Sequence, residues 1–348
     1  MNDSINTLAI SLAEKGAVPD FLLSFGIERA CGQRLREVRA QYSDDPASEF
    51  DRFLTQLDMA PIAESTDEAN EQHYELPPEF FQLILGPRRK YSGCEWPKGV
   101  TTLADAEVAA LKTVVARADI RPGQRILELG CGWGSLCLYL AEKFPSCEIV
   151  TVSNSAGQRG FIESVCVERG FSNLKVITAD INEFEPDGTF DRVVTIEMLE
   201  HVRNYSELFA RIKAWLAVDG KLFVHVFRHK DFAYLFETEG SQNWMGRHFF
   251  TGGVMPSHDL LIRAQDSLDI IESWQVNGTN YALTADAWLD NMTRNRTAIM
   301  RVLDAHYGAT ESSIWYQRWR MFFMACRELF GFDEGMEWGV SHYLFRRA

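Results

Sequence analysis

The chain reads Glu128-Leu129-Gly130-Cys131-Gly132-Trp133-Gly134 directly after a five-residue apolar run at 125–129 and directly before a helical pattern at 135–143. Glycines between a strand and a helix let the backbone turn tightly and approach a ligand at the helix N-terminus. The dinucleotide fingerprint Gly-x-Gly-x-x-Gly would need glycine at Ser135 and an acid about 20 residues further on. The second strand ends instead at Ser153-Asn154, so the sequence disfavours a nicotinamide dinucleotide as the ligand.

Apolar runs and helical patterns alternate outward from this glycine loop. The strand-like runs lie at 125–129, 148–152, 174–178, 192–196 and 221–227, and helical patterns separate them at 135–143, 155–169 and 205–216. Such alternation favours a parallel sheet that is covered on both faces. With right-handed crossovers, the sequence predicts an α/β fold with a doubly wound sheet.

The segments on either side of this core carry other patterns. The first 90 residues are predicted to form helices without strands, near 4–16, 19–42, 47–57 and 79–85, and a further helix is expected at 101–118. Long helical stretches are expected at 229–266 and 277–337, with strands at 267–276 and 338–345. We therefore expect an N-terminal helical extension (1–90), a ligand-binding core (91–228), and a helical cap with the final core strands (229–348).

The composition disfavours several classes of protein. With 35 basic and 49 acidic residues among 348, the net charge is −14, so a nucleic-acid partner is not expected. No run reaches the roughly 18 apolar residues of a membrane span. Seven cysteines without a Cys-x-x-Cys pair favour a reducing, cytoplasmic compartment. His225 and His229 have no acid or cysteine at ligand spacing, so no metal is expected.

The glycine loop resembles a known cofactor motif when its neighbours are included. Its spacing, Glu-x-Gly-x-Gly-x-Gly, is similar to motif I of class I S-adenosyl-L-methionine methyltransferases, and the third predicted strand runs into Asp180-Ile181. In that fold an acid at this place receives the adenine amino group, and its neighbour packs on the ring. The resemblance implies these roles for Asp180 and Ile181. The alternative is an aspartate that only caps a turn.

A second cluster of polar residues follows the fourth predicted strand, where ligands of open α/β sheets gather. Glu197, Glu200 and His201 stand there at i, i+3 and i+4, which places them on one face of a helical turn. Methyl transfer to an amine needs an unprotonated nitrogen. A histidine base suits that chemistry, with a carboxylate that orients it or holds the ammonium. The alternative is an ordinary helix start, because acids favour first turns.

The wider segment from Glu197 to Tyr205 resembles the Glu-x-x-Glu-His-x-x-Asn-Tyr motif of the coclaurine N-methyltransferases, which form one family with the cyclopropane-fatty-acid synthases. Further similar stretches follow in the same order along nearly the whole chain, among them Val18-Pro19, Tyr91-Ser92-Gly93, Thr101-Thr102-Leu103, Asn154-Ser155 and Glu337-Trp338. The resemblance implies a Rossmann-like methyltransferase core with an N-terminal helical extension and an inserted helical cap. It also implies S-adenosyl-L-methionine as cofactor and S-adenosyl-L-homocysteine as product.

The resemblance also implies roles for individual residues. Glu200 and His201 would accept the proton, with Glu197 as the added carboxylate. An aromatic-rich last third provides candidates for a flat pocket around a ring-bearing amine, although an aromatic helix stripe is more often core. These substrate candidates are Tyr281, Trp319, Phe322 and Trp338. The implied cofactor contacts are Tyr91, Ser92, Gly130, Cys131, Gly132, Gly134, Ser153, Asn154, Gln158, Asp180 and Ile181.

Two classes of methyl acceptor remain open at this point. The lipid-modifying relatives typically carry glycine where this chain has Glu197, and cysteine where it has Gly93, whereas Tyr281 resembles a tyrosine of those enzymes. A carboxylate beside the cofactor favours a cationic amine and gives no advantage to an alkene. We predict an S-adenosyl-L-methionine-dependent N-methyltransferase for a small, cyclic or aromatic amine, with methyl or methylene transfer to an unsaturated lipid as the alternative.

Two further classes are disfavoured. A catalytically inactive cofactor-binding module would lack the Glu197, Glu200 and His201 set, and a nicotinamide oxidoreductase would need the missing dinucleotide fingerprint. The sequence leaves open the identity of the amine and whether the chain forms a homodimer.

Overall fold

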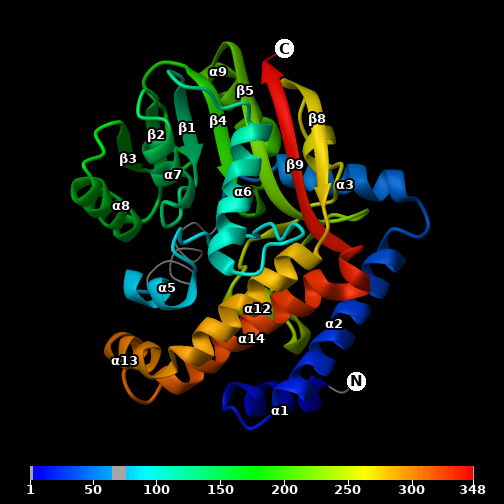
Figure 1. Ribbon diagram of the computed structural model, residues 1–348. Helices are drawn as coiled ribbons and strands as arrows, with labels where there is room; N and C mark the ends of the chain where they lie inside the picture. The colour runs from blue at the N-terminus through cyan, green and yellow to red at the C-terminus, as the bar shows by residue number, and fades with distance from the viewer. Residues whose placement is uncertain (1–2, 65–75, 348) are drawn as a thin grey trace.

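The computed structural model describes residues 3–64 and 76–347, and its centre is a seven-stranded sheet in the order β3-β2-β1-β4-β5-β9-β8 (Figure 1). The strands are β1 (Arg125–Leu129), β2 (Glu148–Ser153), β3 (Leu174–Thr178), β4 (Phe190–Ile196), β5 (Leu216–His229), β8 (Leu268–Val276) and β9 (Trp338–Arg347). The strands from β1 to β5 are parallel, whereas β9 runs antiparallel to both β5 and β8. The predicted α/β doubly wound sheet is confirmed.

Helices cover both faces of this sheet, which explains why its central strands are almost continuously apolar. Leu127 of β1 pairs with Val150 of β2 and Val193 of β4, and all three side chains are buried. One face is packed by α6 (Leu103–Arg117), α7 (Ser135–Lys143) and α8 (Ala156–Arg169), and the other by α3 (Pro46–Asp58) and α9 (Tyr205–Trp215). Side-chain caps start several of these helices; the Ser155 hydroxyl, for example, accepts from the Gln158 N–H at the start of α8.

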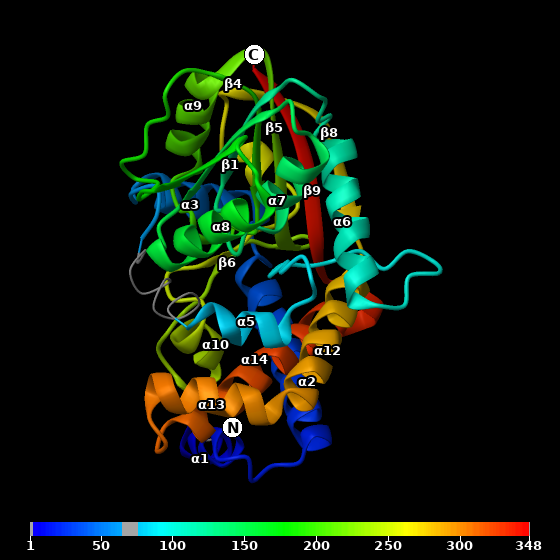
Figure 2. The same cartoon turned by 60° about the vertical axis from the view of Figure 1, so that its left-hand side comes forward.

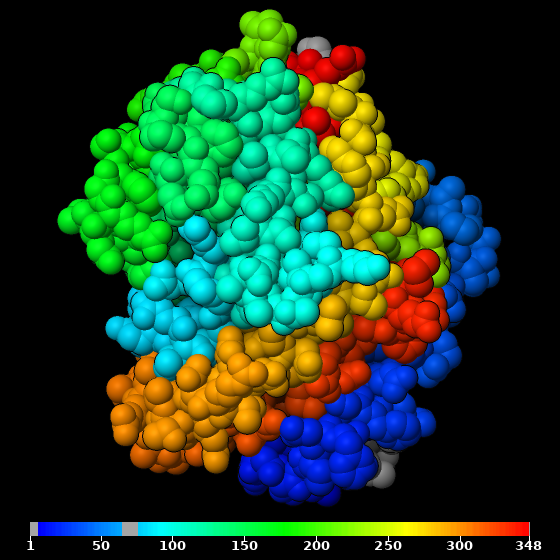
Figure 3. Space-filling view, viewed as in Figure 1, coloured from blue at the N-terminus to red at the C-terminus, as the bar shows by residue number. Residues whose placement is uncertain are grey.

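A layer of helices lies below the carboxyl ends of the parallel strands, and it combines helices from the N-terminal part of the chain with helices that precede β9 (Figures 1 and 2). It contains α1 (Asp3–Glu14), α2 (Asp20–Gln41), α5 (Pro78–Ile84), α12 (Thr279–Arg294), α13 (Arg296–Tyr307) and α14 (Ser312–Gly331). Helix α14 contacts α1, α2, α12 and α13. In the space-filling view, the cyan segment near residue 90 lies between the green sheet region and the gold helices (Figure 3).

Residues 229–266 are where the helix prediction is wrong. This segment forms only short elements, namely β6 (Tyr234–Leu235), η2 (Ser241–Asn243), α10 (Trp244–His248), β7 (Val254–Met255) and α11 (Leu260–Arg263). The chain folds closely on itself here, so that a Cβ at Gly246 would collide with the Glu237 carbonyl oxygen. The buried side chains of Phe249 and Met255 gain their contacts from tertiary packing and not from a helical face. The helical prediction for 277–337 is confirmed.

Three negative findings apply to the described segments alone. Every helix in them is too short or too polar to serve as a membrane span. Within 3–64 and 76–347, no group of three or more His, Cys, Asp or Glu residues is placed to hold a metal ion. All seven cysteines are buried and unpaired with one another.

Candidate active site

The glycine loop joins β1 to α7 and forms one wall of a cavity. The N–H groups of Gly130 and Cys131 donate to the Val152 carbonyl over 3.0 and 3.2 Å, which ties the loop to the end of β2. Gly130 has a φ of +78°, which favours glycine. A side chain there would collide with Met198, because its Cβ would lie 2.8 Å from the Met198 Cβ. The loop therefore presents mainly backbone to the cavity.

The cavity has a volume of about 150 Å³ and lies at the carboxyl ends of β1, β2, β3 and β4. Gly134 does not line it, since this residue caps α7 with a φ of +80°. Asp180 does not line it either. The predicted cofactor residues that do line it are Tyr91, Ser92, Gly130, Cys131, Gly132, Ser153, Asn154, Gln158 and Ile181.

Asp180 organises the chain beside the cavity. One oxygen of its carboxylate accepts from the backbone N–H and the side-chain amide of Asn182, over 2.8 and 2.9 Å. The Asn182 amide in turn makes two hydrogen bonds to the backbone of Ala63, which lines the cavity. The structure thus shows the turn-forming role of this aspartate, and a contact to adenine stays a prediction.

Several atoms in the cavity wall are suited to a polar ligand. The Ser135 hydroxyl, the Gln158 side-chain nitrogen and the Trp133 indole nitrogen are buried and have no hydrogen-bond partner within the described part of the chain. Such atoms are rare in native proteins. An added Cβ at Gly132 would meet nothing within 4 Å, so the loop faces open space there. The two side-chain N–H donors, the Ser135 hydroxyl and the open backbone at Gly132 can form hydrogen bonds with the polar groups of S-adenosyl-L-methionine.

Glu197 follows β4 directly and has a φ of +47°, a strained value for a residue with a side chain. Its carboxylate accepts from the Gly93 N–H over 2.9 Å and from the Tyr281 hydroxyl over 2.8 Å, and it lies 3.1 Å from the His225 Nε2. Burial raises the pKa of this carboxyl, and the positive charge of buried Lys90 and these donors oppose the rise. Because the donors favour the charged form, we assign a carboxylate.

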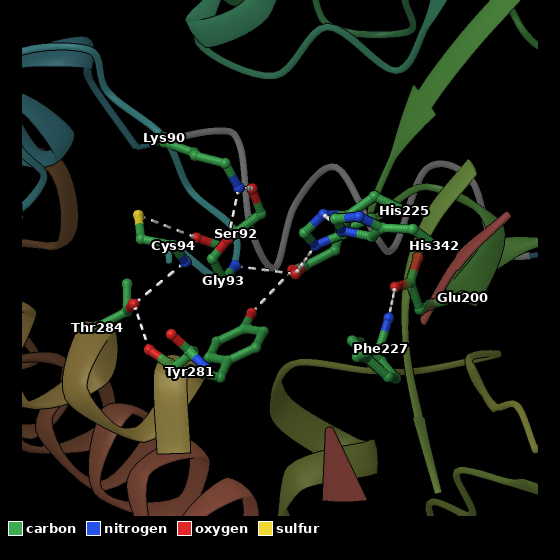
Figure 4. Close-up of polar contacts among 12 residues, drawn as sticks. Lys90, Ser92, Gly93, Cys94, Glu200, His225, Phe227, Tyr281, Thr284 and His342 are labelled. Atoms are coloured by element: carbon green, nitrogen blue, oxygen red, sulfur yellow. Dashed lines mark hydrogen bonds and ion pairs between the residues drawn. The ribbon is translucent and has the colours of Figure 1, made fainter. Parts of the chain in front are cut away.

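Glu200 does not share the cavity with Glu197 and His201, in contrast to the predicted common face. Its side chain is fully buried, and one oxygen accepts from the Phe227 N–H of β5 over 2.8 Å (Figure 4). The left-handed backbone of Glu197 and the tight 3₁₀ turn Leu199–His201 replace the expected α-helical turn. Burial and the nearby charge of Glu197 hold the pKa of Glu200 well above its ordinary value, which favours the neutral form of this group.

His201 lies in the cavity wall, as predicted for a base. Its ring stacks on Phe250, with ring centres 5.8 Å apart and planes 7° from parallel. Burial lowers the pKa of this imidazole to about 4, although the charge of Glu197 acts in the opposite direction. The ring is therefore neutral near pH 7 and can accept a proton.

The four predicted substrate residues divide into two groups. Tyr281 reaches the site, because its hydroxyl bonds to Glu197, and its ring stacks on Phe330 with centres 4.1 Å apart. Trp319, Phe322 and Trp338 are buried and do not line the cavity. Their rings pack against other aromatic side chains in the core. A position in the core was the alternative to a substrate contact for these residues.

The sequence interpretation missed four basic residues at or behind the site. Arg89 and Lys90 line the cavity, and the buried Lys90 ammonium donates to the Ser92 hydroxyl and the Gly93 carbonyl over 2.5 and 2.7 Å. His225 and His342 lie together (Figure 4), and the His225 Nε2 lies 3.1 Å from a Glu197 oxygen. The signal that was present is the run Arg88-Arg89-Lys90 directly before Tyr91-Ser92 in an acidic chain.

Comparisons with known proteins identify the family and the fold. Residues 63–336 match the mycolic acid cyclopropane synthetase family. The chain is 33% identical over 338 residues to the (S)-coclaurine N-methyltransferase of Thalictrum flavum subsp. glaucum, covering 96% of this chain and 94% of that protein. A crystal structure of coclaurine N-methyltransferase bound to N-methylheliamine and SAH matches with a TM-score of 0.94, at 31% identity, over 98% of this chain and 99% of that one.

The fold and the site thus define an S-adenosyl-L-methionine-dependent methyltransferase, and the predicted enzyme class and cofactor are confirmed. The chain belongs to the mycolic acid cyclopropane synthetase family, and it is a homologue of the coclaurine N-methyltransferases. The similarity to the cyclopropane-fatty-acyl-phospholipid synthase of Escherichia coli is weaker, at 29% identity over 223 residues, which cover 63% of this chain and 55% of that protein.

Proposed function

We propose that the chain transfers the methyl group of S-adenosyl-L-methionine to the nitrogen of a small cyclic or ring-bearing amine. The observation that carries this proposal is the Glu197 carboxylate, which is held by several hydrogen bonds in the wall that faces the glycine loop. An alkylamine is a cation near neutral pH, and a carboxylate as buried as that of Glu197 attracts it more strongly than one in water. The names of the relatives matched over nearly the whole chain, which are N-methyltransferases, support the same function.

The amine must lose a proton before its lone pair can attack. When bound, the cofactor supplies an electrophilic methyl group, and the new N–C bond forms as the C–S bond breaks. We assign the proton to the neutral His201 ring, because it lines the same cavity as Glu197. The Glu197 charge stabilises the imidazolium that results. Glu200, buried behind this pair, would fix the turn that carries His201 by its bond to β5.

We propose that the predicted cofactor residues bind S-adenosyl-L-methionine, some through the glycine loop and others through the segments beside it. The loop backbone at Gly130, Cys131 and Gly132 would hold the methionine end, with Gly134 setting the start of α7. Ser153, Asn154 and Gln158 would contact the ribose, and Asp180 and Ile181 would contact the adenine. Tyr91 and Ser92 would close over the cofactor.

Methyl or methylene transfer to an unsaturated lipid is the second candidate, since the matching family is named for cyclopropane synthetases. An alkene carries no proton to lose and no charge for Glu197 to balance. The cavity places this carboxylate where a lipid chain would need apolar surface. This arrangement favours the amine.

The test is a transfer assay with methyl-labelled S-adenosyl-L-methionine against a panel of cyclic amines and unsaturated phospholipids. We expect label in at least one amine and none in lipid, with loss of transfer in Glu197→Gln. The variant His306→Ala, on the exposed surface of α13, serves as a control that keeps full activity. Labelled phospholipid without any labelled amine would establish the second candidate in place of the first.

Three finer expectations about the protein are also proposals. We propose that it acts in the cytoplasm, which its seven unpaired cysteines support. A homodimer is proposed as the assembly and is testable by light scattering. We also propose a division into an extension (1–90), a core (91–228) and a cap (229–348), in which α1 and α2 of the extension pack on α14 of the cap.

A further inference from the structure

A chain of hydrogen bonds leads from the protein surface to the back of Glu197. The Arg117 guanidinium of α6 lies 2.5 Å from the His342 Nδ1, and the His342 Nε2 lies 2.8 Å from the His225 Nδ1. The His225 Nε2 completes the chain, 3.1 Å from a Glu197 oxygen. The two histidines come from the neighbouring antiparallel strands β5 and β9, where they form a register pair (Figure 4).

The direction of every hydrogen bond in this chain follows from its first member. A guanidinium only donates, so the His342 Nδ1 must accept. A neutral imidazole carries one N–H, and that proton therefore stands on the His342 Nε2 and points at His225. The His225 Nδ1 must accept in turn, which leaves its own N–H on Nε2, directed at Glu197. Both rings are neutral, because burial and the positive charges of Arg117 and Lys90 lower the pKa of each well below its ordinary value.

We propose that Arg117 sets the tautomers of His342 and His225 so that the chain donates to Glu197 and cannot remove a proton from it. A proton can move from Glu197 to His225 only if the His225 Nε2 is free to accept, and this nitrogen already carries hydrogen. The three residues are positioning residues that hold Glu197 as an acceptor. The proton of the substrate must then leave on the cavity side, where His201 lies.

The count of hydrogen bonds at Glu197 agrees with this arrangement. A carboxylate has about four lone-pair sites. Within residues 3–64 and 76–347, donors occupy three of them, through the Gly93 N–H, the His225 Nε2–H and the Tyr281 hydroxyl. One site is left for a group that enters the cavity, which is enough for a single N–H of an ammonium. The consequence for catalysis rests on the proposed function, whereas the tautomers do not.

Nuclear magnetic resonance can read the tautomers directly. In protein with ¹⁵N-labelled histidine, two-bond ¹H–¹⁵N correlations distinguish Nδ1–H, Nε2–H and charged rings, and the variants His225→Gln and His342→Gln assign the signals. We expect neutral Nε2–H rings at both positions from mildly acidic to mildly alkaline pH. Arg117→Met should release the His342 ring into a mixture of tautomers. A charged or Nδ1–H ring in the native protein would overturn the proposal, as would unchanged tautomers in Arg117→Met.

The effect on catalysis is read from a pH profile. His225→Leu removes one hydrogen bond to the charged Glu197. The apparent pKa of the acidic limb of the kcat/KM profile should therefore rise by about one unit. His225→Gln retains an N–H near the Nε2 position and should restore the profile. Other titratable or charged groups that act on Glu197 or on the two rings are Lys90, Cys94, Arg117, Glu200, His201, Tyr281 and Cys326.

The outcomes separate the two proposals. An acidic limb that stays in place in a folded, cofactor-binding His225→Leu protein would overturn the positioning role, as would a failure of the glutamine variant to restore it. If the native protein methylated no amine while its histidines showed the expected tautomers, the proposed function would fail and the hydrogen-bond chain would stand.

Discussion

The two walls of the cavity are held in place by different means. The wall of the glycine loop depends on backbone, since the N–H groups of Gly130 and Cys131 bond to the neighbouring strand β2. The wall after β4 depends on side chains from distant parts of the chain. Glu197 bonds to partners that stand 104, 28 and 84 residues away in sequence, namely Gly93, His225 and Tyr281.

This difference separates two properties of the enzyme. A wall of backbone changes shape only when a residue alters the local dihedral angles or blocks the space, so its variants should act on cofactor affinity. A wall of side chains loses function when one group is deleted or neutralised, while the cofactor surface remains intact. We therefore expect cofactor affinity and turnover to respond to different substitutions.

The largest effect is expected for His201→Ala. General acid–base residues contribute about 10²–10⁴ in rate, so turnover should fall by that factor. Affinity for S-adenosyl-L-homocysteine, measured by calorimetry, should change little, because the glycine loop is untouched. His306→Ala, on the exposed part of α13, controls for the loss of an imidazole. Native turnover in His201→Ala would show that another group accepts the proton.

The two glutamates of the turn should respond unequally to the same substitution. Glu197→Gln removes a negative charge beside the amine, and we expect turnover to fall by about 10²-fold. Burial raises the pKa of Glu200 and favours its neutral form, so Glu200→Gln, which has a similar shape and no charge, should lower turnover only a few-fold. Glu200→Ala should be more damaging than glutamine, because it leaves the Phe227 N–H without its acceptor. Equal losses for the two glutamine variants would contradict the assigned charges.

The cofactor wall is tested by Gly130→Ala. A Cβ at this position meets Met198 and requires a strained φ of +78°. Strain of this kind costs on the order of 1–3 kcal/mol, so the affinity for S-adenosyl-L-homocysteine should fall by about tenfold or more. Gly160→Ala is the matched control, since it lies in α8 with nothing within 4 Å of the added carbon. Equal affinities in the two variants would show that the loop backbone is not a binding surface.

The same difference explains what the sequence could predict. The strands 125–129 and 174–178 and the helix 135–143 are found at the predicted residues, because apolar runs and glycine punctuation are local signals. The glycine loop follows from these elements, and most of its predicted contacts line the cavity. The antiparallel direction of β9 between β5 and β8 has no local signal and was not predicted.

For the wall after β4, the sequence predicted which types of residue are present but not how they are arranged. The spacing of Glu197, Glu200 and His201 suggested one helical face, but the left-handed Glu197 turns its side chain away from Glu200. That conformation is stabilised by Gly93, His225 and Tyr281, and periodicity carries no information about such distant partners. The helix prediction for 229–266 was wrong for a related reason, because the apolar residues of this segment are buried by tertiary packing around close backbone contacts.

The last expected effect concerns stability against acid and not turnover or affinity. Burial lowers the pKa of His201 to about 4 from an ordinary value of 6.5. As the pH falls below 6.5, the unfolded chain binds a proton at this residue and the native protein does not, so the free energy of unfolding decreases until about pH 4. The decrease from this one group is at most about 3 kcal/mol.

His201→Gln removes that contribution, because an amide does not titrate. Urea unfolding between neutral pH and about pH 4 should show a shallower loss of stability for this variant than for the native protein, whereas His306→Gln should follow the native curve. The buried histidines behind Glu197 contribute equally to all three proteins and cancel in the difference. Parallel curves for His201→Gln and the native protein would mean that His201 is already as easily protonated in the folded state as in the unfolded chain. In that case the imidazole would be charged in mild acid, and the wall after β4 would lack its neutral base.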